Sequence, residues 1–197
     1  MMHIRPIRES DDSSLAPIIR SNLAAFGLAI PGTAAFDPET DHLSVFYGAS
    51  SRRAYFVVED DDDGRVLGGA GIAEMDGDDS TAELQKLYLD DAAKGHGLGY
   101  RLIGRITTFA LAVGYRRLYL ETHHALEAAN HIYRRSGFIL MDGPLPGSVH
   151  GGAMDRFYIR ALHDAAGSAT EPAAGPEGNE KRHEEGRWGR ESHEAKA

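Results

Sequence analysis

The clearest hydrophobic pattern in the chain lies between residues 83 and 113. Residues 83–89 form a short, mostly apolar segment, which is typical of a β-strand. After a glycine-rich segment at residues 94–99, apolar side chains recur at intervals of three and four, the spacing of a helix with one buried face. These apolar positions are Leu98, Leu102, Ile103, Ile106, Phe109, Ala110 and Val113. The pattern therefore predicts a strand, a glycine-rich loop and a helix, in that order.

Similar patterns predict six further strands and three further helices. The strands are expected at residues 3–8, 53–59, 66–74, 117–122, 138–141 and 154–162. The helices are expected at residues 13–26, 37–48 and 126–136, and polar turns at 60–64 and 76–80. A helix separates strands 83–89 and 117–122, so these two are expected to pair in parallel. The predicted fold class is α/β (α+β), a mixed and mostly antiparallel sheet of about seven strands with helices on both faces.

The last part of the chain differs in composition from the rest. Residues 164–197 are rich in Gly, Pro, Glu and Arg and contain almost no aliphatic side chains. Such a segment cannot bury enough apolar surface to offset the entropy lost on ordering, so we expect a disordered polar tail. The sequence thus divides into a domain at residues 1–163 and a tail at residues 164–197.

Composition narrows the possible partners. The 197 residues carry a formal net charge of −9, which argues against a nucleic-acid partner. No apolar run approaches the roughly 20 residues that span a bilayer, and the N-terminus lacks the apolar segment of a signal peptide, so no membrane partner is expected. The chain has no cysteine, which excludes disulfides and thiolate ligands. We therefore expect a cytoplasmic protein without a metal, and a homodimer is one option that the sequence leaves open.

The glycine-rich segment is the first candidate for chemistry. A glycine-rich turn that leads into a helix can hold a phosphate, because the first N–H groups of the helix have no helical partner and the helix dipole favours an anion. Gly95, Gly97 and Gly99 lack the spacing of a dinucleotide-binding loop, and the Walker sequence is absent. From the glycines alone, a flexible loop before a helix is an equal alternative.

Two motifs resemble the GNAT superfamily of acetyltransferases, in particular its small bacterial members. Lys94-x-x-Gly97-x-Gly99 is similar to the [RQ]-x-x-G-x-[GA] pyrophosphate loop of that family, with lysine in place of Arg or Gln. His96 stands where related members often carry Lys or Arg. The segment NHIYRRSGF at residues 130–138 resembles the family's N-x-x-[YF]-x-x-x-G-F segment. The motifs have the family's order and spacing, and the resemblance extends over residues 3–162.

The resemblance implies the GNAT acyl-CoA acyltransferase fold and an acetyltransferase that uses acetyl-CoA as co-substrate. The acetyl group would pass to an amine of a small molecule or peptide by direct transfer in a ternary complex. In this family the central strand parts from its parallel neighbour beside the loop and faces the thioester. The residues implied for acetyl-CoA binding are Leu87, Tyr88, Leu89, Lys94, Gly95, His96, Gly97, Leu98, Gly99, Tyr100, Asn130 and Tyr133. A non-catalytic acyl-CoA-binding sensor or interaction module on the same scaffold is the alternative.

The same resemblance suggests which residues transfer protons. Tyr133 matches the tyrosine that protonates the leaving thiolate, and Asn130, three residues earlier on the same helix face, would bind the CoA arm. Glu83 matches the general base of some members that acetylate lysine. Strand alternation is expected to place Glu83, Gln85, Leu87 and Leu89 on one face.

Other interpretations of these acidic and histidine residues remain open. Glu83 could instead be a structural residue that bonds a neighbouring helix, and Glu121 or water could act as the base. Glu121, His123 and His150 are candidates for lining the acceptor pocket, His150 because it resembles a histidine found in close relatives. Each histidine could equally be a simple exposed side chain.

Overall fold

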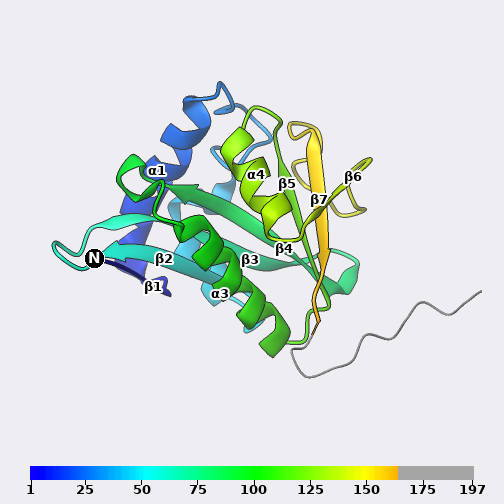
Figure 1. The fold of residues 1–197 in the computed structure, drawn as a ribbon, viewed down its shortest axis with the longest axis horizontal. Coiled ribbons are helices and arrows are strands. Elements are labelled where there is room, and N and C mark those ends of the chain that lie inside the picture. Colours follow the sequence, from blue (N-terminus) through cyan, green and yellow to red (C-terminus); the bar gives the residue numbers. More distant parts are fainter. Residues whose placement is uncertain (164–197) are drawn as a thin grey trace, which may run out of the picture. The chain divides into compact units, whose positions relative to one another are not determined.

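The computed structural model describes residues 1–163, and the predicted tail at residues 164–197 lies outside them. The described residues form a seven-stranded sheet with helices on both faces, which confirms the predicted fold class (Figure 1). The strands are β1 (Met2–Pro6), β2 (Ala54–Asp60), β3 (Val66–Met75), β4 (Asp78–Leu89), β5 (Arg117–Thr122), β6 (Ile139–Met141) and β7 (Arg156–Ala161). The helices are α1 (Asp12–Ala24), α2 (Leu43–Gly48), α3 (Leu98–Ala112) and α4 (Glu127–Arg135), with short 3-10 helices η1 (Glu9–Asp11), η2 (Pro38–Asp41) and η3 (Asp91–Ala93).

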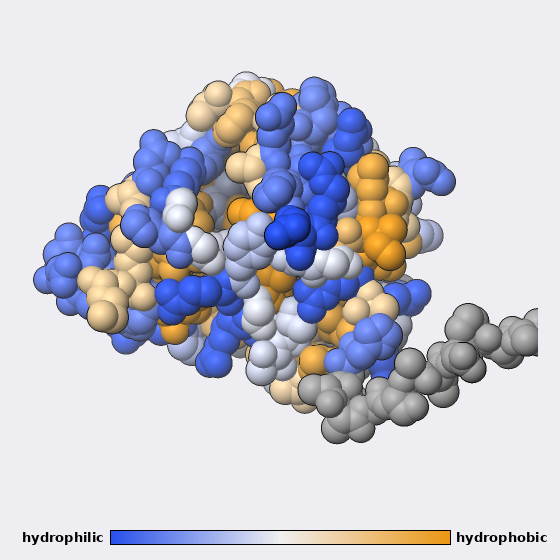
Figure 2. Space-filling model, viewed as in Figure 1, coloured by the Kyte–Doolittle hydropathy of each residue, from blue (hydrophilic) through white to orange (hydrophobic). Residues whose placement is uncertain are grey.

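The strand order is β1-β2-β3-β4-β5-β7-β6, and only β4 and β5 are parallel neighbours. Because α3 joins β4 to β5 across one face, this pair confirms the predicted parallel β-α-β unit. At one edge of the sheet, β6 leaves Ile139 70% and Leu140 51% exposed. Figure 2 shows an apolar patch in this region of the surface.

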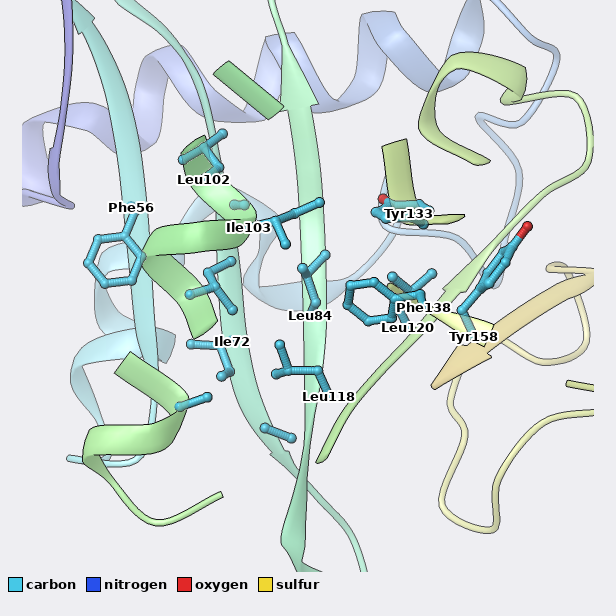
Figure 3. Close-up of a cluster of buried hydrophobic side chains, with 14 of the residues drawn as sticks. Phe56, Ile72, Leu84, Leu102, Ile103, Leu118, Leu120, Tyr133, Phe138 and Tyr158 are labelled. Atoms are coloured by element: carbon cyan, nitrogen blue, oxygen red, sulfur yellow. The ribbon is translucent and has the colours of Figure 1, made fainter. Parts of the chain in front are cut away.

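Each face of the sheet has its own hydrophobic core. On the face covered by α3 and α4, buried side chains include Phe56, Ile72, Leu84, Leu102 and Tyr133 (Figure 3). On the opposite face, α1 and α2 cover a cluster that includes Leu15, Ile19, Leu43, Tyr47 and Val57. The central strand β4 sends side chains into both layers, so a feature of β4 can act on both faces at once.

The predicted polar turn at residues 76–80 is shorter in the structure. Only Asp76 and Gly77 lie between β3 and β4, and Met75 already pairs with Asp78. Gly77 has a φ of +79°, and an Asp-Gly pair is the common sequence of a two-residue hairpin turn. The strand that contains Glu83 therefore begins five residues earlier than the predicted residue 83.

The single helix predicted at residues 37–48 is two helices in the structure. His42, with a φ of −140°, leaves the helical conformation between η2 and α2. Asp12 of α1 accepts hydrogen bonds from the backbone N–H and the hydroxyl of Ser44, at 2.9 and 2.6 Å. These bonds satisfy groups in the first turn of α2 and tie its start to α1. Among residues 1–163, no helix has both the length and the apolar character needed to cross a membrane.

Two glycines offer a test of the packing. A Cβ at Gly71 of β3 would overlap the ring and hydroxyl of Tyr47, whereas a Cβ at Gly104, on the exposed side of α3, would meet nothing within 4 Å. We expect Gly71→Ala to destabilise the fold by ~1–3 kcal/mol, as overpacking does. Gly104→Ala should stabilise it by ~0.5–1 kcal/mol, because alanine favours a helix. Urea unfolding of both variants measures the difference, and equal midpoints would contradict this packing.

Candidate active site

The parallel pairing of β4 with β5 ends in the middle of the sheet. Thr81, Ala82 and Glu83 pair with β5, but β4 continues to Leu89 and β5 to Thr122 without further pairing between them. The strands therefore part after Glu83, as the family resemblance implied. On the edge of β4 that faces β5, no strand of residues 1–163 pairs with residues 84–89. The carbonyl oxygen of Leu89 accepts a hydrogen bond from the Asn22 side chain at 3.1 Å, and the backbone groups on this edge before Leu89 are available to a ligand.

A bulge at Lys86 lies just beyond this parting point. On β3, Gly71 pairs with Gln85 and Gly69 with Tyr88, so β4 has one extra residue between these pairs. Lys86 has a φ of +49° and is the only non-glycine residue with positive φ among residues 1–163. Its carbonyl oxygen accepts a hydrogen bond from the buried Tyr55 hydroxyl at 3.1 Å.

The bulge corrects the predicted side-chain alternation. Gln85 and Glu83 share a face, since the Gln85 Nε2 donates to Glu83 Oε2 at 2.7 Å. Leu87 and Leu89 instead pack in the core of the opposite face, with α3 and α4. The prediction that Glu83, Gln85, Leu87 and Leu89 share one face was wrong, because an extra residue in a strand reverses the alternation.

The glycine-rich segment has the geometry of an anion cradle. Gly95 and Gly97 have φ values of +80° and +70°, and a Cβ on either would meet no atom within 4 Å, so the space beside both is open. Gly97 is the N-cap of the 15-residue helix α3 and offers no side-chain capping bond. The N–H groups in the first turn of α3 therefore point towards open space, where the helix dipole favours an anion.

The side chains around this cradle have different surroundings. Leu98 is buried in the core, and Gly99 lies where a Cβ would be 3.1 Å from Ile132 of α4, so glycine allows the two helices to approach. Tyr100 is 42% exposed and His96 is exposed. Lys94 donates a hydrogen bond to Asp91 at 2.6 Å in an exposed ion pair. A phosphate could replace Asp91 as the partner of Lys94 at little cost in free energy.

Tyr133 lies on the same face of the sheet as Leu87, beside Phe138 and Tyr158 (Figure 3). Burial raises the pKa of its phenol, and the nearby Tyr158 adds to this effect. A phenol is protonated at neutral pH even with its ordinary pKa, so the hydroxyl of Tyr133 holds a proton that it could donate. Tyr133 and Tyr88 lie close enough for the charge of one phenolate to raise the pKa of the other.

Asn130, predicted to contact the CoA arm, makes hydrogen bonds within the protein. Its amide nitrogen donates to the carbonyl oxygens of His123 and Leu126, at 2.8 and 2.9 Å. Its oxygen accepts a hydrogen bond from Tyr158 at 2.9 Å. Both N–H donors are thus used inside the protein, so in this structure Asn130 holds the turn between β5 and α4 that positions Tyr133.

A small cavity on the opposite face brings together most of the predicted acceptor-site residues. Its volume of about 40 Å³ is enough for a water molecule. It is lined by Ala34, Glu83, Leu84, Gln85, Lys86, Tyr88, Glu121, His150 and Met154. Glu121 accepts a hydrogen bond from Tyr119 at 3.1 Å, while its other carboxylate oxygen is buried without a partner among residues 1–163. A buried carboxylate oxygen without a hydrogen-bond donor favours a cationic ligand.

Glu83 is well placed for proton transfer in this cavity. It is 8% exposed, and Gln85, which orients it, in turn accepts a hydrogen bond from Tyr47 at 2.9 Å. Burial raises the pKa of Glu83, and the charge of Glu121 adds to this, while the bond from Gln85 and the charges of His150 and Lys86 oppose it. A carboxylate with a raised pKa is a stronger base than an exposed one.

The structure adds three residues that the sequence analysis did not name as site residues: Lys86, Asp37 and Glu39. Lys86 is buried, and its ammonium donates to Asp37 at 2.6 Å and to Glu39 at 2.9 Å. His150 is 3.0 Å from the other oxygen of Asp37. Burial would raise the pKa of Asp37, but His150 and Lys86 outweigh this and lower it. His150, predicted to line the acceptor pocket, lies at this cavity, whereas the partners of Lys86 lie 47 and 49 residues away in sequence.

His123 does not line this cavity. It lies with His124 against Asp155, whose Oδ2 is 2.5 Å from His124 Nδ1 and 4.0 Å from His123 Nε2. These three are the described residues whose ligand atoms, within 4.8 Å of one another, could hold a metal ion. His123 Nδ1 already accepts a hydrogen bond from the Ala125 N–H at 3.2 Å, which favours the proton on Nε2, the nitrogen nearest Asp155.

Comparisons with known proteins identify relatives of this chain. The model of the acetyltransferase (GNAT) family matches residues 24–138. The uncharacterized N-acetyltransferase YjgM of Escherichia coli (strain K12) is 36% identical over 149 residues, which cover 75% of this chain and 87% of that protein.

Solved structures show the same fold at lower identity. A GNAT-family acetyltransferase from Staphylococcus aureus Mu50 superposes with a TM-score of 0.70 at 20% identity, over 83% of this chain and all of that chain. The protein yncA from Salmonella typhimurium, solved with acetyl-CoA, has a TM-score of 0.65 at 23% identity, over 86% of this chain and 99% of that chain. A phosphinothricin acetyltransferase from Sinorhizobium meliloti, also with acetyl-CoA, has a TM-score of 0.63 at 23% identity, over 86% of this chain and 94% of that chain.

Proposed function

This chain belongs to the acetyltransferase (GNAT) family and is an acyltransferase, and on this premise we propose that it transfers an acetyl group from acetyl-CoA directly to an amine of a small molecule or peptide. The observation that carries the proposal is the arrangement around β4. The open cradle of α3 and Tyr133 lie on one side of the sheet, and the buried carboxylate of Glu83 lies on the other. Between them, β4 and β5 part.

The cradle and the free edge of β4 suit the two ends of acetyl-CoA. We assign the pyrophosphate to the backbone of residues 94–100, where the open space at Gly95 and Gly97 supports this placement. The pantetheine, an amide-containing arm, would pair with the edge of β4 at residues 87–89, as an added strand does. A backbone N–H beside the bulge would then polarise the thioester carbonyl.

Two residues would move the protons. Glu83 takes a proton from the acceptor ammonium, and the freed amine nitrogen attacks the thioester carbon. When the carbon–sulfur bond breaks, Tyr133 gives its proton to the sulfur. The nitrogen loses its second proton, which restores the Tyr133 phenol by way of solvent, and Glu83 releases the first proton to water, so the products are an amide, CoA thiol and one proton. The orphan oxygen of Glu121 supports a role in holding the ammonium before transfer. Glu121 and water remain the competing bases.

A thiol-release assay tests this function. The protein is incubated with acetyl-CoA and a panel of amino acids, polyamines and aminoglycosides, and free thiol is measured against time. We expect release that depends on at least one amine. Binding of acetyl-CoA without release for any amine would favour the alternative of a non-catalytic sensor.

Gly97→Asp tests the cradle. Acetyl-CoA at 100 times its dissociation constant should stabilise the wild-type protein by about 2.7 kcal/mol, which a thermal shift detects. The carboxylate introduced by the substitution would repel the pyrophosphate, so the shift should disappear in this variant. Gly97→Asn is the matched control, because asparagine has the same size, carries no charge and tolerates a positive φ. Equal shifts in both variants would contradict a phosphate at this position.

Tyr133→Phe tests the general acid. The substitution removes one hydroxyl and keeps the ring that packs on Phe138 and Tyr158. General acid catalysis contributes about 100- to 10,000-fold, so kcat should fall by that factor. The dissociation constant of acetyl-CoA should stay the same, since the lost interaction is made mainly in the transition state. Full turnover under conditions where chemistry limits the rate would show that Tyr133 is only a packing residue.

Glu83→Gln tests the base through its pH dependence. Turnover at neutral pH should fall, with partial recovery at high pH where free amine is more abundant. The same substitution should not lower the free energy of unfolding at neutral pH. The folded pKa of Glu83 lies above its unfolded value, so the wild-type protein loses stability as pH rises from the unfolded to the folded pKa. The glutamine variant lacks this loss, and its melting temperature at neutral pH should equal or exceed that of the wild type. Unchanged turnover at every pH would assign the base to Glu121 or water.

A further inference from the structure

Lys86 combines two unfavourable features at one position. Its backbone has a φ of +49°, a conformation that side chains other than Gly, Asn and Asp rarely adopt. Its side chain is only 2% exposed, so its charge is largely removed from water. Both features persist only if the surrounding structure stabilises them.

The stabilising contacts come from three separate segments. Asp37 and Glu39, at the start of η2, receive the ammonium at 2.6 and 2.9 Å. His150, in the loop before β7, bonds the same Asp37. Tyr55 of β2 donates to the Lys86 carbonyl at 3.1 Å. The bulge, η2 and the loop of His150 are thus joined through one lysine.

Lys86 also lies between the two halves of the proposed reaction. Gln85 before it lines the acceptor cavity and orients Glu83, and Leu87 after it belongs to the face of α3 and Tyr133. A change in the bulge would therefore move the acceptor side and the thioester side together. The cavity itself, at about 40 Å³, holds little more than water, so an amine acceptor must displace part of its cover.

We propose that Lys86 is a positioning residue. It couples His150, which lines the acceptor cavity, together with Asp37 and Glu39, which bond Lys86 (these three form the cover), to the β4 bulge that faces the thioester. Acceptor binding then depends directly on the ion pairs of Lys86, whereas the pyrophosphate cradle of α3 has no part in them, so acetyl-CoA binding depends on Lys86 much less. This inference rests on the proposed acetyl transfer.

Lys86→Met provides the test, since methionine removes the charge and keeps a long unbranched side chain. The KM for the acceptor should rise by about 10- to 100-fold, the usual cost of a misplaced group. The acetyl-CoA thermal shift should remain. Arg20→Met is the matched control, because Arg20 pairs with Asp41 of the same η2 at 2.7 Å, but this pair is exposed whereas that of Lys86 is buried. It should leave both values near those of the wild type.

The pH profile separates positioning from mere support of the fold. The groups that act on Glu83 are Glu121 of β5, His150 of the loop, and Gln85 and Lys86 of β4. Loss of the Lys86 charge removes one cation near Glu83, so the pH at which turnover rises should move upward in Lys86→Met. An unchanged profile with an unchanged acceptor KM would overturn the proposal. An equal rise in the KM values of acetyl-CoA and acceptor would do the same.

A further variant guards against misfolding, because Lys86→Met leaves Asp37 and Glu39 without their cation. The triple variant Lys86→Met, Asp37→Asn, Glu39→Gln removes the charge imbalance and should fold while keeping the high acceptor KM. Lys86→Gly relieves the backbone strain but also removes the ammonium, so it should be as impaired as Lys86→Met. Wild-type acceptor KM in Lys86→Gly would show that only the backbone conformation matters and would overturn the ion-pair role.

Hydrogen exchange tests the coupling between the cover and the bulge independently of turnover. In Lys86→Met, amide protection should fall both at residues 37–42 and at residues 85–88, whereas Arg20→Met should affect neither the bulge nor Glu39. Loss of protection in only one of these segments would overturn the coupling. If the wild-type protein binds acetyl-CoA but acetylates no amine, the proposed function fails, and hydrogen exchange still shows whether Lys86 joins the two segments.

Discussion

A strand inside a sheet normally has hydrogen-bond partners on both edges, and β4 loses one of them after Glu83. This loss is the constraint on which the rest of the site depends. Backbone groups without a partner are costly when buried, so the open edge needs water or a ligand. The parting also separates the ends of β4 and β5, which leaves room for the start of α3 on one face and for the cavity of Glu83 and Glu121 on the other. The geometry proposed for catalysis thus follows from where one pair of strands stops pairing.

Charge balance is the second organising feature of the acceptor side. Four carboxylates, from Asp37, Glu39, Glu83 and Glu121, lie around a single lysine and one histidine. The lysine and the histidine hold Asp37 ionised, so the negative charge of the cover is neutralised locally. Glu83 and Glu121 lie outside these pairs. Burial raises the pKa of Glu83, and the repulsion between its charge and that of Glu121 adds to this. An arriving ammonium ion would relieve this repulsion, which makes a cationic amine a suitable acceptor for this cavity.

The sequence predicted the elements well because local chemistry determines them. The glycine-rich loop, the apolar stripe of α3 and the parallel pairing with β5 each depend on a pattern within a few residues or on one connection. The ion pairs of Lys86 could not be predicted, because they join residues nearly 50 positions apart and no periodicity records them. The contacts of Asn130 were also missed, because a motif match gives a residue type and not its hydrogen bonds. The bulge did leave a signal. Leu84, Leu87 and Leu89 all pack on the α3 face. The interval of three residues between Leu84 and Leu87 is odd, and in a regular strand residues at an odd interval lie on opposite faces.

The bulge also divides β4 into two sets of positions for protein engineering. Residues before it, such as Glu83 and Gln85, reach the acceptor cavity, whereas Leu87 and Leu89 after it face the cofactor side. A library intended to change the acceptor could therefore vary position 85, keep Glu83 as the proposed base, and leave 87 and 89 constant. An alignment that shifts the extra residue by one place would exchange the two sets, and the same library would then alter the wrong substrate.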